Sequence, residues 1–424
     1  MPIFACRRII VLSVLAAIGL APTARAQVLL PPDIIKKRAE REEKNSHSAP
    51  TTRPASASGD ARPLRDDQAA RIDSLRAAAL GFDPAASAAA LRELRGMGQP
   101  ARPALHDVVR QLLAHDRSVI EAAHSLPSSA RLHELSDKIY AERQAARTNI
   151  DKLAHDETIK IAHDHYTSLK ALRNELDGAF DQTDAILAAL SRRASLRTLW
   201  HEVAATGESA FGDEEEAKLD AKAQKMVSMT AEQAASVPQL GQGEQPAEPV
   251  LRDLWFYRAC RRIEAFNIAL KACMTQGEFE NFSAVNAYRR CLGVLPYELD
   301  SRLVASARGH SKEMVDLKYF AHESPVAANK SPWDRIRAAG YPQGSGENIA
   351  AGPTDAEQIF GMWFDSPGHH QNMARPGSTA MGVGQVGNHW TQNMGSAPRL
   401  LLASPEERKA ALAAANSAAP KGMN

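Results

Sequence analysis

Apolar positions between Pro127 and Pro238, a stretch without proline, recur at a spacing typical of helices. Gaps of three, four, seven, four and three residues separate Leu132, Leu135, Ile139, Ala146, Ile150 and Leu153. This spacing is close to a heptad repeat, although Glu142 stands where the seam requires an apolar residue. After the polar run 155–160 the pattern resumes through Tyr166, Leu169, Leu172, Leu176, Phe180, Ile186, Leu187 and Leu190. We expect one or two long helices folded back as a hairpin or small bundle, with a surface for homo-oligomerisation within 129–205.

A shorter helix pair is expected before this hairpin. Leu91 and Leu94 lie on one apolar face, Gly96–Pro100 interrupts it, and a second apolar face follows at Leu105, Val108, Val109 and Leu112. The pair is similar to a single HEAT-type unit, but such repeats need stacked neighbours, so an ordinary helical hairpin remains the alternative. We place the whole helical region at 69–207.

Polar segments divide the chain into further parts. Residues 27–68 contain the Ser/Pro/Thr-rich run 46–58 and cannot bury enough apolar area to fold, so we expect a disordered tether. Residues 208–249 combine an acidic run with prolines and glycines, which predicts a linker. An apolar-faced helix is expected from about residue 250, and residues 401–424 are expected to form a tail.

The last third of the chain shows helical and strand patterns together. Apolar spacing and capping residues predict helices over 283–289 and 300–315, one that starts at Ser331–Pro332, and one over 355–364. Alternation over 379–386 and 388–394, around Gly387–Asn388, predicts a β-hairpin. Helices that flank an antiparallel sheet form an α-β-α sandwich. We therefore expect an α+β chain, in which this C-terminal sandwich follows a mainly α-helical, partly coiled-coil-like region.

The N-terminus predicts export. Arg7 and Arg8 precede the apolar run Ile9–Leu20, and Ala24–Ala26 reads as a small-x-small cleavage site. These features are typical of a signal peptide over residues 1–26, with an uncleaved membrane anchor as the alternative. No later stretch is apolar enough to cross a bilayer, so we expect a periplasmic or extracellular protein without a transmembrane segment.

Cysteine usage allows one disulfide at most. Cleavage would remove Cys6 and leave Cys260, Cys273 and Cys291 in an oxidising space. Antiparallel helices over 251–275 and 279–293, turning near Gly277, would place Cys260 opposite Cys291. We expect a bridge between those two cysteines, with Cys273 free.

Charge and motif searches exclude several functions. The formal net charge of +1 argues against a nucleic-acid partner. No Gly-x-Ser-x-Gly elbow, Walker motif or dinucleotide fingerprint is present, and His322–Glu323 lacks the second histidine of a zincin helix.

An ordered series of short motifs spans the last third of the chain. The motifs are Val285–Arg289, Leu303–Met314, Tyr319–Pro325, Trp333–Ile336, Gly346–Ala350, Trp363–His369, Met381–Gly384 and His389–Gln392. In this order and spacing they resemble the bacterial branch of the CAP superfamily, the cysteine-rich secretory, antigen 5 and pathogenesis-related proteins, whose domain is also called SCP. The resemblance covers about residues 278–396 and implies a CAP domain over 250–400 that carries an extra N-terminal helix.

The resemblance also implies a cleft. Carried over by motif, His322, Glu347 and His389 line it, and His369 lies near it. Glu347 is expected in a turn within Gly-Glu-Asn, and the Phe320 ring is expected to anchor the loop of His322 in the core. His370 is expected to face solvent. The family's fourth residue, a glutamate shortly after a helical tryptophan, falls on Ser366; the adjacent Asp365 is displaced by about 100° around a helix. We therefore expect a binding cleft of His322, Glu347, Asp365, His369 and His389.

Two imidazoles and a carboxylate suit a divalent cation such as Zn²⁺, so His322, His389 and Glu347 are the candidate metal ligands. A hydrogen-bonded cluster without metal is the alternative. His310, inside the second motif, is interpreted as a helix histidine with its hydrogen bonds satisfied.

Three functions are compatible with this resemblance. The first is a non-catalytic module that binds a lipid, glycan or protein ligand of the cell envelope or extracellular space. The second is a metal-assisted, peptidase-like hydrolase with His322, Glu347 and His389 as catalytic residues. The third is a structural envelope protein assembled through its helical region. The first is favoured because a fold alone gives little warrant for an activity, and the question of catalysis stays open.

Overall fold

The computed structural model describes residues 66–81, 83–123, 126–150, 156–204, 213–227 and 229–420. The expected signal peptide and nearly all of the expected tether lie outside these residues. None of the helices in the described part of the chain combines the length and the apolar character needed to cross a membrane.

The first helices form a small bundle with the far end of a much longer one. They are α3 (Asp66–Ala79), α4 (Pro84–Gly96), the 3-10 turn η2 (Gln99–Ala101) and α5 (Arg102–Ala122). The helix pair expected here is α4 and α5. Their apolar faces pack with α3 and with Leu196, Trp200 and Val203 of α7. These neighbours differ from the pair in length and sequence, whereas a HEAT unit stacks on units like itself.

The expected long hairpin is present as α6 (Ser129–Ile150) and α7 (Asp156–Val203). Its seam residues are buried against each other and against α10 of the same chain. Glu142 fits into the seam because its carboxylate pairs with His165 Nδ1 of α7 at 2.8 Å. Most of the described seam residues therefore pack within the chain itself.

The stretch expected to be a linker contains two helices, α8 (Asp213–Met226) and α9 (Ala231–Ser236). The acidic run opens α8, where Glu216 and Asp220 both pair with the fully buried Arg193 of α7. This acidic segment, which the sequence pattern indicated as exposed, is therefore held against α7 by ion pairs with Arg193. A capping box of Thr230 and Gln233 starts α9.

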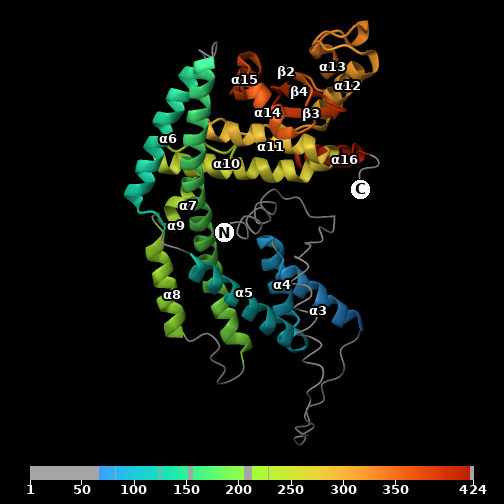
Figure 1. The fold of residues 1–424 in the computed structure, drawn as a ribbon. Coiled ribbons are helices and arrows are strands. Elements are labelled where there is room, and N and C mark those ends of the chain that lie inside the picture. The colour runs from blue at the N-terminus through green and yellow to red at the C-terminus, as the bar shows by residue number, and fades with distance from the viewer. Residues whose placement is uncertain are drawn as a thin grey trace, which may run out of the picture.

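The C-terminal part is a sheet between helices (Figure 1). Its elements are α10 (Pro249–Leu270), η3 (Lys271–Cys273), α11 (Gln276–Cys291), β1 (Glu298–Leu299), α12 (Ser301–Leu317), η4 (Ala327–Asn329), α13 (Pro332–Ala338), β2 (Gly344–Ala351), α14 (Ala356–Phe364), α15 (Pro367–Ala374), β3 (Ala380–Val386), β4 (His389–Gly395), η5 (Leu400–Leu402) and α16 (Pro405–Ser417). The strand order is β1-β3-β4-β2, with β1 parallel to β3 and the other pairs antiparallel. The α+β class is confirmed.

Local signals account for most of these elements. Asp300, Ser331 and Asp355 cap the helices expected to start there. Gly387, with φ of 58°, turns β3 into β4 as the hairpin pattern predicts. The tail expected over 401–424 instead contains α16, whose Ala415 is buried in the main core together with Leu401.

The sheet carries helices on both faces. On one face, Gly382 and Gly384 of β3 let α12 approach so closely that an added Cβ would overlap the backbone of Leu303–Val304 or of Arg308. On the other face, Gln392 of β4 donates to Asn281 of α11 at 2.7 Å, and Trp363 of α14 donates to the Ile349 carbonyl at 3.1 Å. This is the α-β-α layering expected from the sequence.

Buried ion pairs join this domain to the helical arm formed by α6 and α7. Arg173 of α7 reaches Asp253 of α10 at 3.2 Å, and Arg290 of α11 reaches Asp177 of α7 at 2.8 Å. Figure 1 shows the long α7 running across the ends of α10 and α11. The arm and the domain therefore share one core.

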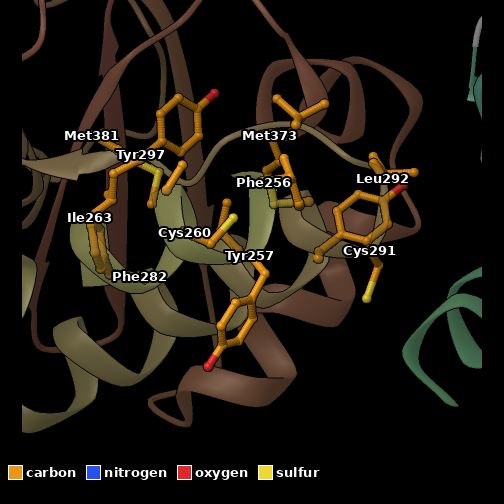
Figure 2. Packing of buried hydrophobic residues seen from close by; sticks show 14 of the residues in the cluster. Phe256, Tyr257, Cys260, Ile263, Phe282, Cys291, Leu292, Tyr297, Met373 and Met381 are labelled. Atoms are coloured by element: carbon orange, nitrogen blue, oxygen red, sulfur yellow. The ribbon is translucent and has the colours of Figure 1, made fainter. Parts of the chain in front are cut away.

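The expected Cys260–Cys291 disulfide is absent; these two cysteines and Cys273 are buried thiols. The helices turn at Met274–Thr275 rather than near Gly277, because Thr275 and Glu278 form a capping box there. Figure 2 shows the sulfur atoms of Cys260 and Cys291 well apart. Burial raises the pKa of all three thiols, to about 12 at Cys273 and about 11 at Cys291.

Candidate functional site

The centre of the candidate site is the Glu347 carboxylate. Glu347 lies in β2, opposite Asn393 of β4, and not in the turn that its Gly-Glu-Asn context suggested. Its side chain is 2% exposed. Nη2 of Arg335, from α13, donates to Oε1 at 3.0 Å and to Oε2 at 2.7 Å. The buried negative charge is thus neutralised by a buried guanidinium.

Two further groups complete the shell of Glu347. His322 Nδ1 lies 2.8 Å from Oε1, so this nitrogen carries the hydrogen and Nε2 is left on the opposite edge of the ring. The Asn393 amide, in the orientation that satisfies both of its ends, donates to Oε2 at 3.0 Å and accepts from Ser306 Oγ. Three donor groups, from Arg335, His322 and Asn393, therefore surround the two carboxylate oxygens.

Two hydrogen bonds to backbone carbonyls hold the loop that carries His322. Arg335 Nη2 also donates to the His322 carbonyl at 3.0 Å, and His310 Nε2 donates to the Ala321 carbonyl at 3.1 Å. His310 is fully buried in α12, 4.0 Å from Glu347 Oε1. Burial lowers its pKa, although the nearby Glu347 opposes the shift. His310 is a neutral anchor of this loop, with its hydrogen bond satisfied as expected.

His369 lies beside His322. It sits on α15, its Nδ1 is 2.8 Å from Ser366 Oγ, and its backbone carbonyl accepts from Asn348 at 3.2 Å. Burial, with a contribution from the charge of His322, lowers the pKa of His369.

His389 opens β4 as expected but does not join the Glu347 cluster. Its Nδ1 is 3.0 Å from Asn388 Oδ1, and its ring centroid lies 6.1 Å from that of Phe320. Phe320, expected to anchor its loop in the core, is instead 52% exposed. The ring therefore lies at the surface, near His389.

Asp365 is directed away from the cleft. It caps the end of α14 and pairs with His163 Nε2 of α7 at 2.7 Å, with both side chains about half exposed. The displacement around the helix anticipated from Trp363 turns this carboxylate toward the arm. His370, which we interpreted as facing solvent, is fully buried between Tyr288 Oη and the Phe364 carbonyl, both 2.6 Å from its ring.

Sequence reasoning missed Arg335 and Asn393. Both lie within or beside quoted motifs, but neither pattern indicates which acidic group they would contact. The partners of Glu347 become visible only once α13 and β4 are placed on either side of β2.

In the described part of the chain, the three candidate metal ligands are not grouped as a site of three side chains. Across the described ranges, no three His, Cys, Asp or Glu side chains are grouped so that they could hold an ion. Both oxygens of Glu347 already accept from Arg335, and a cation so close disfavours direct ligation by that carboxylate. The donor set therefore does not fit Glu347 as a metal ligand.

Comparisons with known proteins agree with the geometry. A model of the cysteine-rich secretory protein family, CAP, matches residues 282–394. The protein YkwD of Bacillus subtilis is 40% identical over 110 residues, which are 25% of this chain and 42% of that protein. The membrane protein YlbC of the same organism is 30% identical over 124 residues, 29% of this chain and 35% of that protein. The chain thus spans less than half the length of these relatives.

Two solved structures are each similar to less than a third of the chain. An extracellular protein containing an SCP domain from Bacillus anthracis is 31% identical over 28% of this chain and 40% of its own, with a TM-score of 0.27. An outer surface protein from Borrelia burgdorferi is 16% identical over 29% of this chain and 93% of its own, with a TM-score of 0.26.

Proposed function

We propose that this chain, whose residues 282–394 are a CAP domain, is an exported protein whose cleft binds an apolar ligand without catalytic turnover. The observation that carries the proposal is the state of the buried Glu347 carboxylate, which is paired with Arg335 and also accepts from His322 and Asn393. The basic start, apolar run and cleavage pattern at the N-terminus support export.

These hydrogen bonds and the ion pair make Glu347 poorly suited to be the general base of a hydrolase. A general base must present a free lone pair to water or substrate and have a pKa near the working pH. Glu347 is buried, is paired with Arg335 and accepts hydrogen bonds from His322 and Asn393 as well. It acts here as a structural anion that orients His322 and fixes the loop around it.

The exposed groups around this anion suit binding. Phe320 precedes His322 by two residues, and Trp333 precedes Arg335 by two; both rings are about half exposed. Trp333 packs over the start of β2, where a Cβ on Gly344 would come within 2.8 Å of its ring. Exposed aromatic rings in the segments that carry Arg335 and the half-exposed His322 offer an apolar surface with one hydrogen-bonding group.

A neutral apolar fluorophore tests this proposal. We expect N-phenyl-1-naphthylamine to bind saturably and to shift the emission of Trp333, which is 45% exposed, whereas the other four tryptophans are at most 8% exposed. Phe320→Ala and Trp333→Ala should each weaken binding about tenfold, since each removes an aromatic contact of about 1 kcal/mol or more. The matched control is Met362→Ala, which removes an equally exposed apolar side chain from α14.

Saturable binding that all three variants leave unchanged would contradict the proposal. The same holds if the wild-type chain does not bind the probe.

A metal-assisted hydrolase is the second candidate, supported by the His322–Glu347 hydrogen bond. Histidines that bind zinc commonly donate their other ring N–H to a carboxylate, which leaves Nε2 for the metal. Calorimetric titration with Zn²⁺, together with a peptide-cleavage assay, separates the two functions. One equivalent of bound Zn²⁺ that His322→Ala and His389→Ala both abolish, with cleavage lost in parallel, would replace the binding function by the hydrolase.

A further inference from the structure

A cavity lies where the helical arm meets α10. It encloses about 350 Å³, within the usual range for small-molecule sites. Its walls come from α6, α10, the loop before α10 and the turn after α11. Neither the cleft residues nor the function proposed above involve it.

Positive charge predominates in the lining of this cavity. Arg143, Arg147 and Arg252 line it, and Asp253 is the one acidic residue among the lining side chains. Asp253 is already engaged, because it accepts from Ser136 Oγ at 2.6 Å and pairs with Arg173 at 3.2 Å. Its contact with Arg143 is longer, at 3.6 Å.

Arg143, at the base of the cavity, lacks full compensation. Its guanidinium lies against the Phe256 ring at 5.3 Å, and the Arg173 guanidinium lies 5.1 Å from the same ring. One of its terminal nitrogens, Nη2, is buried without a hydrogen-bond partner. Burial lowers the pKa of Arg143 to about 10, the neighbouring Arg173 and Arg147 contribute to this shift, and Asp253 opposes it.

The two other arginines are open to a ligand. Arg147 donates to the Leu292 carbonyl at 3.2 Å but has no acidic partner among the described residues. In the part of the chain that the structure describes, the Arg252 guanidinium makes no hydrogen bond or ion pair. Both side chains can therefore turn toward an anion in the cavity at little cost.

The remaining wall is aromatic, and one backbone feature preserves the space. Tyr140, Trp255 and Phe256 line the cavity. Gly293, with φ of 67°, lies so close to Arg143 that a Cβ would come within 2.7 Å of its Cζ. The absence of a side chain on Gly293 therefore leaves room for the Arg143 guanidinium.

We propose that this cavity is a binding site for a small organic anion, a carboxylate or phosphate on a flat apolar body. The arginines neutralise the anion, and the aromatic wall takes the body. Guanidinium groups suit both carboxylate and phosphate oxygens, so the two anion types share one recognition chemistry.

Calorimetry with four probes tests the site on the full chain: phenyl phosphate, benzoate, inorganic phosphate and neutral phenol. We expect phenyl phosphate or benzoate to bind saturably, more tightly than phenol or inorganic phosphate. The tighter of these two probes identifies the preferred anion. The double variant Arg147→Gln/Arg252→Gln should weaken that binding about a hundredfold, because two charge-assisted hydrogen bonds are lost.

Two controls make the outcome specific. Arg92→Gln removes an exposed arginine of α4 and should leave the affinity unchanged. Phe320→Ala should also leave it unchanged, so that failure of this site and failure of the cleft proposal are distinguishable. Phenol that binds as tightly as the anions, or a double variant that binds as the wild type does, would overturn the inference.

Discussion

At the scale of single residues, the buried Arg335–Glu347 pair decides what the candidate site can do. Removing one member of such a pair leaves a buried charge without its partner, at a cost of about 3 kcal/mol or more. We expect Arg335→Met and Glu347→Gln each to lower the free energy of unfolding by about 3 kcal/mol. Because both remove the same interaction, the double variant should lose less than the sum. Urea denaturation of all four proteins measures this, and additive losses would show that the two residues act independently.

His370 gives a prediction on pH. Its Nδ1–H donates to the Phe364 carbonyl and its Nε2 accepts from Tyr288 Oη, so both nitrogens of the neutral ring are satisfied and a second proton would break the bond that Tyr288 donates. Burial lowers the pKa of His370 below the ordinary value of 6.5. The unfolded chain therefore binds more protons than the folded one below about pH 6.5, and stability falls as the pH drops through that range.

We expect His370→Gln to flatten this dependence, by about 1.4 kcal/mol for each unit of the pKa shift that is removed. Thermal denaturation from about pH 7.5 down to about pH 5 measures the slope on both sides of the ordinary histidine pKa. The comparison is His133→Gln, which changes an exposed histidine of α6. A slope unchanged in His370→Gln would show that this ring does not hold off a proton.

The same scale shows how far sequence reasoning could go. The pairing of His322 with Glu347 was anticipated because both stand in motifs that resemble one family. Arg335 was not, because an arginine one turn into a helix is usually solvated, and its burial depends on where β2 lies. Asp365 and His163 are far apart along the chain, so no local pattern could indicate their contact.

At the scale of elements, the spacing between α12 and β3 depends on two glycines. Gly384 faces the backbone of Arg308 so closely that any side chain must push the helix away. We expect Gly384→Ala to cost about 3 kcal/mol, at the upper end for overpacking. The matched control is Gly361→Ala in α14, where an added Cβ meets no atom within 4 Å and should stabilise the helix by about 0.5–1 kcal/mol. The melting temperatures of the two variants should therefore shift in opposite directions. A fall in both would show that the close approach of α12 to Gly384 is not the cause.

Elements defined by local signals were predictable, and those defined by distant partners were not. Neighbouring residues alone indicate the N-caps at Asp300, Ser331 and Asp355 and the turn at Gly387. Glu347 was expected in a turn because Gly-Glu-Asn is locally turn-like. It lies in a strand because β4, more than forty residues later, pairs along most of β2.

At the scale of the whole molecule, an aromatic contact fastens the arm to the domain near the His163–Asp365 pair. Tyr166 of α7 lies 5.1 Å from the Tyr288 ring and 5.7 Å from the Phe364 ring. We expect Tyr166→Ala to cost about 2 kcal/mol, below the usual range for a core aromatic because the ring is only partly buried. Asp365→Asn should cost less than about 1 kcal/mol, since its ion pair is half exposed. Urea denaturation of the two variants measures each loss in the free energy of unfolding. A larger loss in Asp365→Asn than in Tyr166→Ala would assign the attachment to the ion pair.

The three thiols link the durability of the protein to its folding. Only a thiolate attacks a disulfide or an oxidant, and burial keeps Cys260, Cys273 and Cys291 protonated and out of reach. In an oxidising environment each sulfur can then react only during the moments when the surrounding core has opened. The rate of cysteine oxidation is therefore set by how often the core opens. Any ligand that stabilises the native state also slows this oxidation.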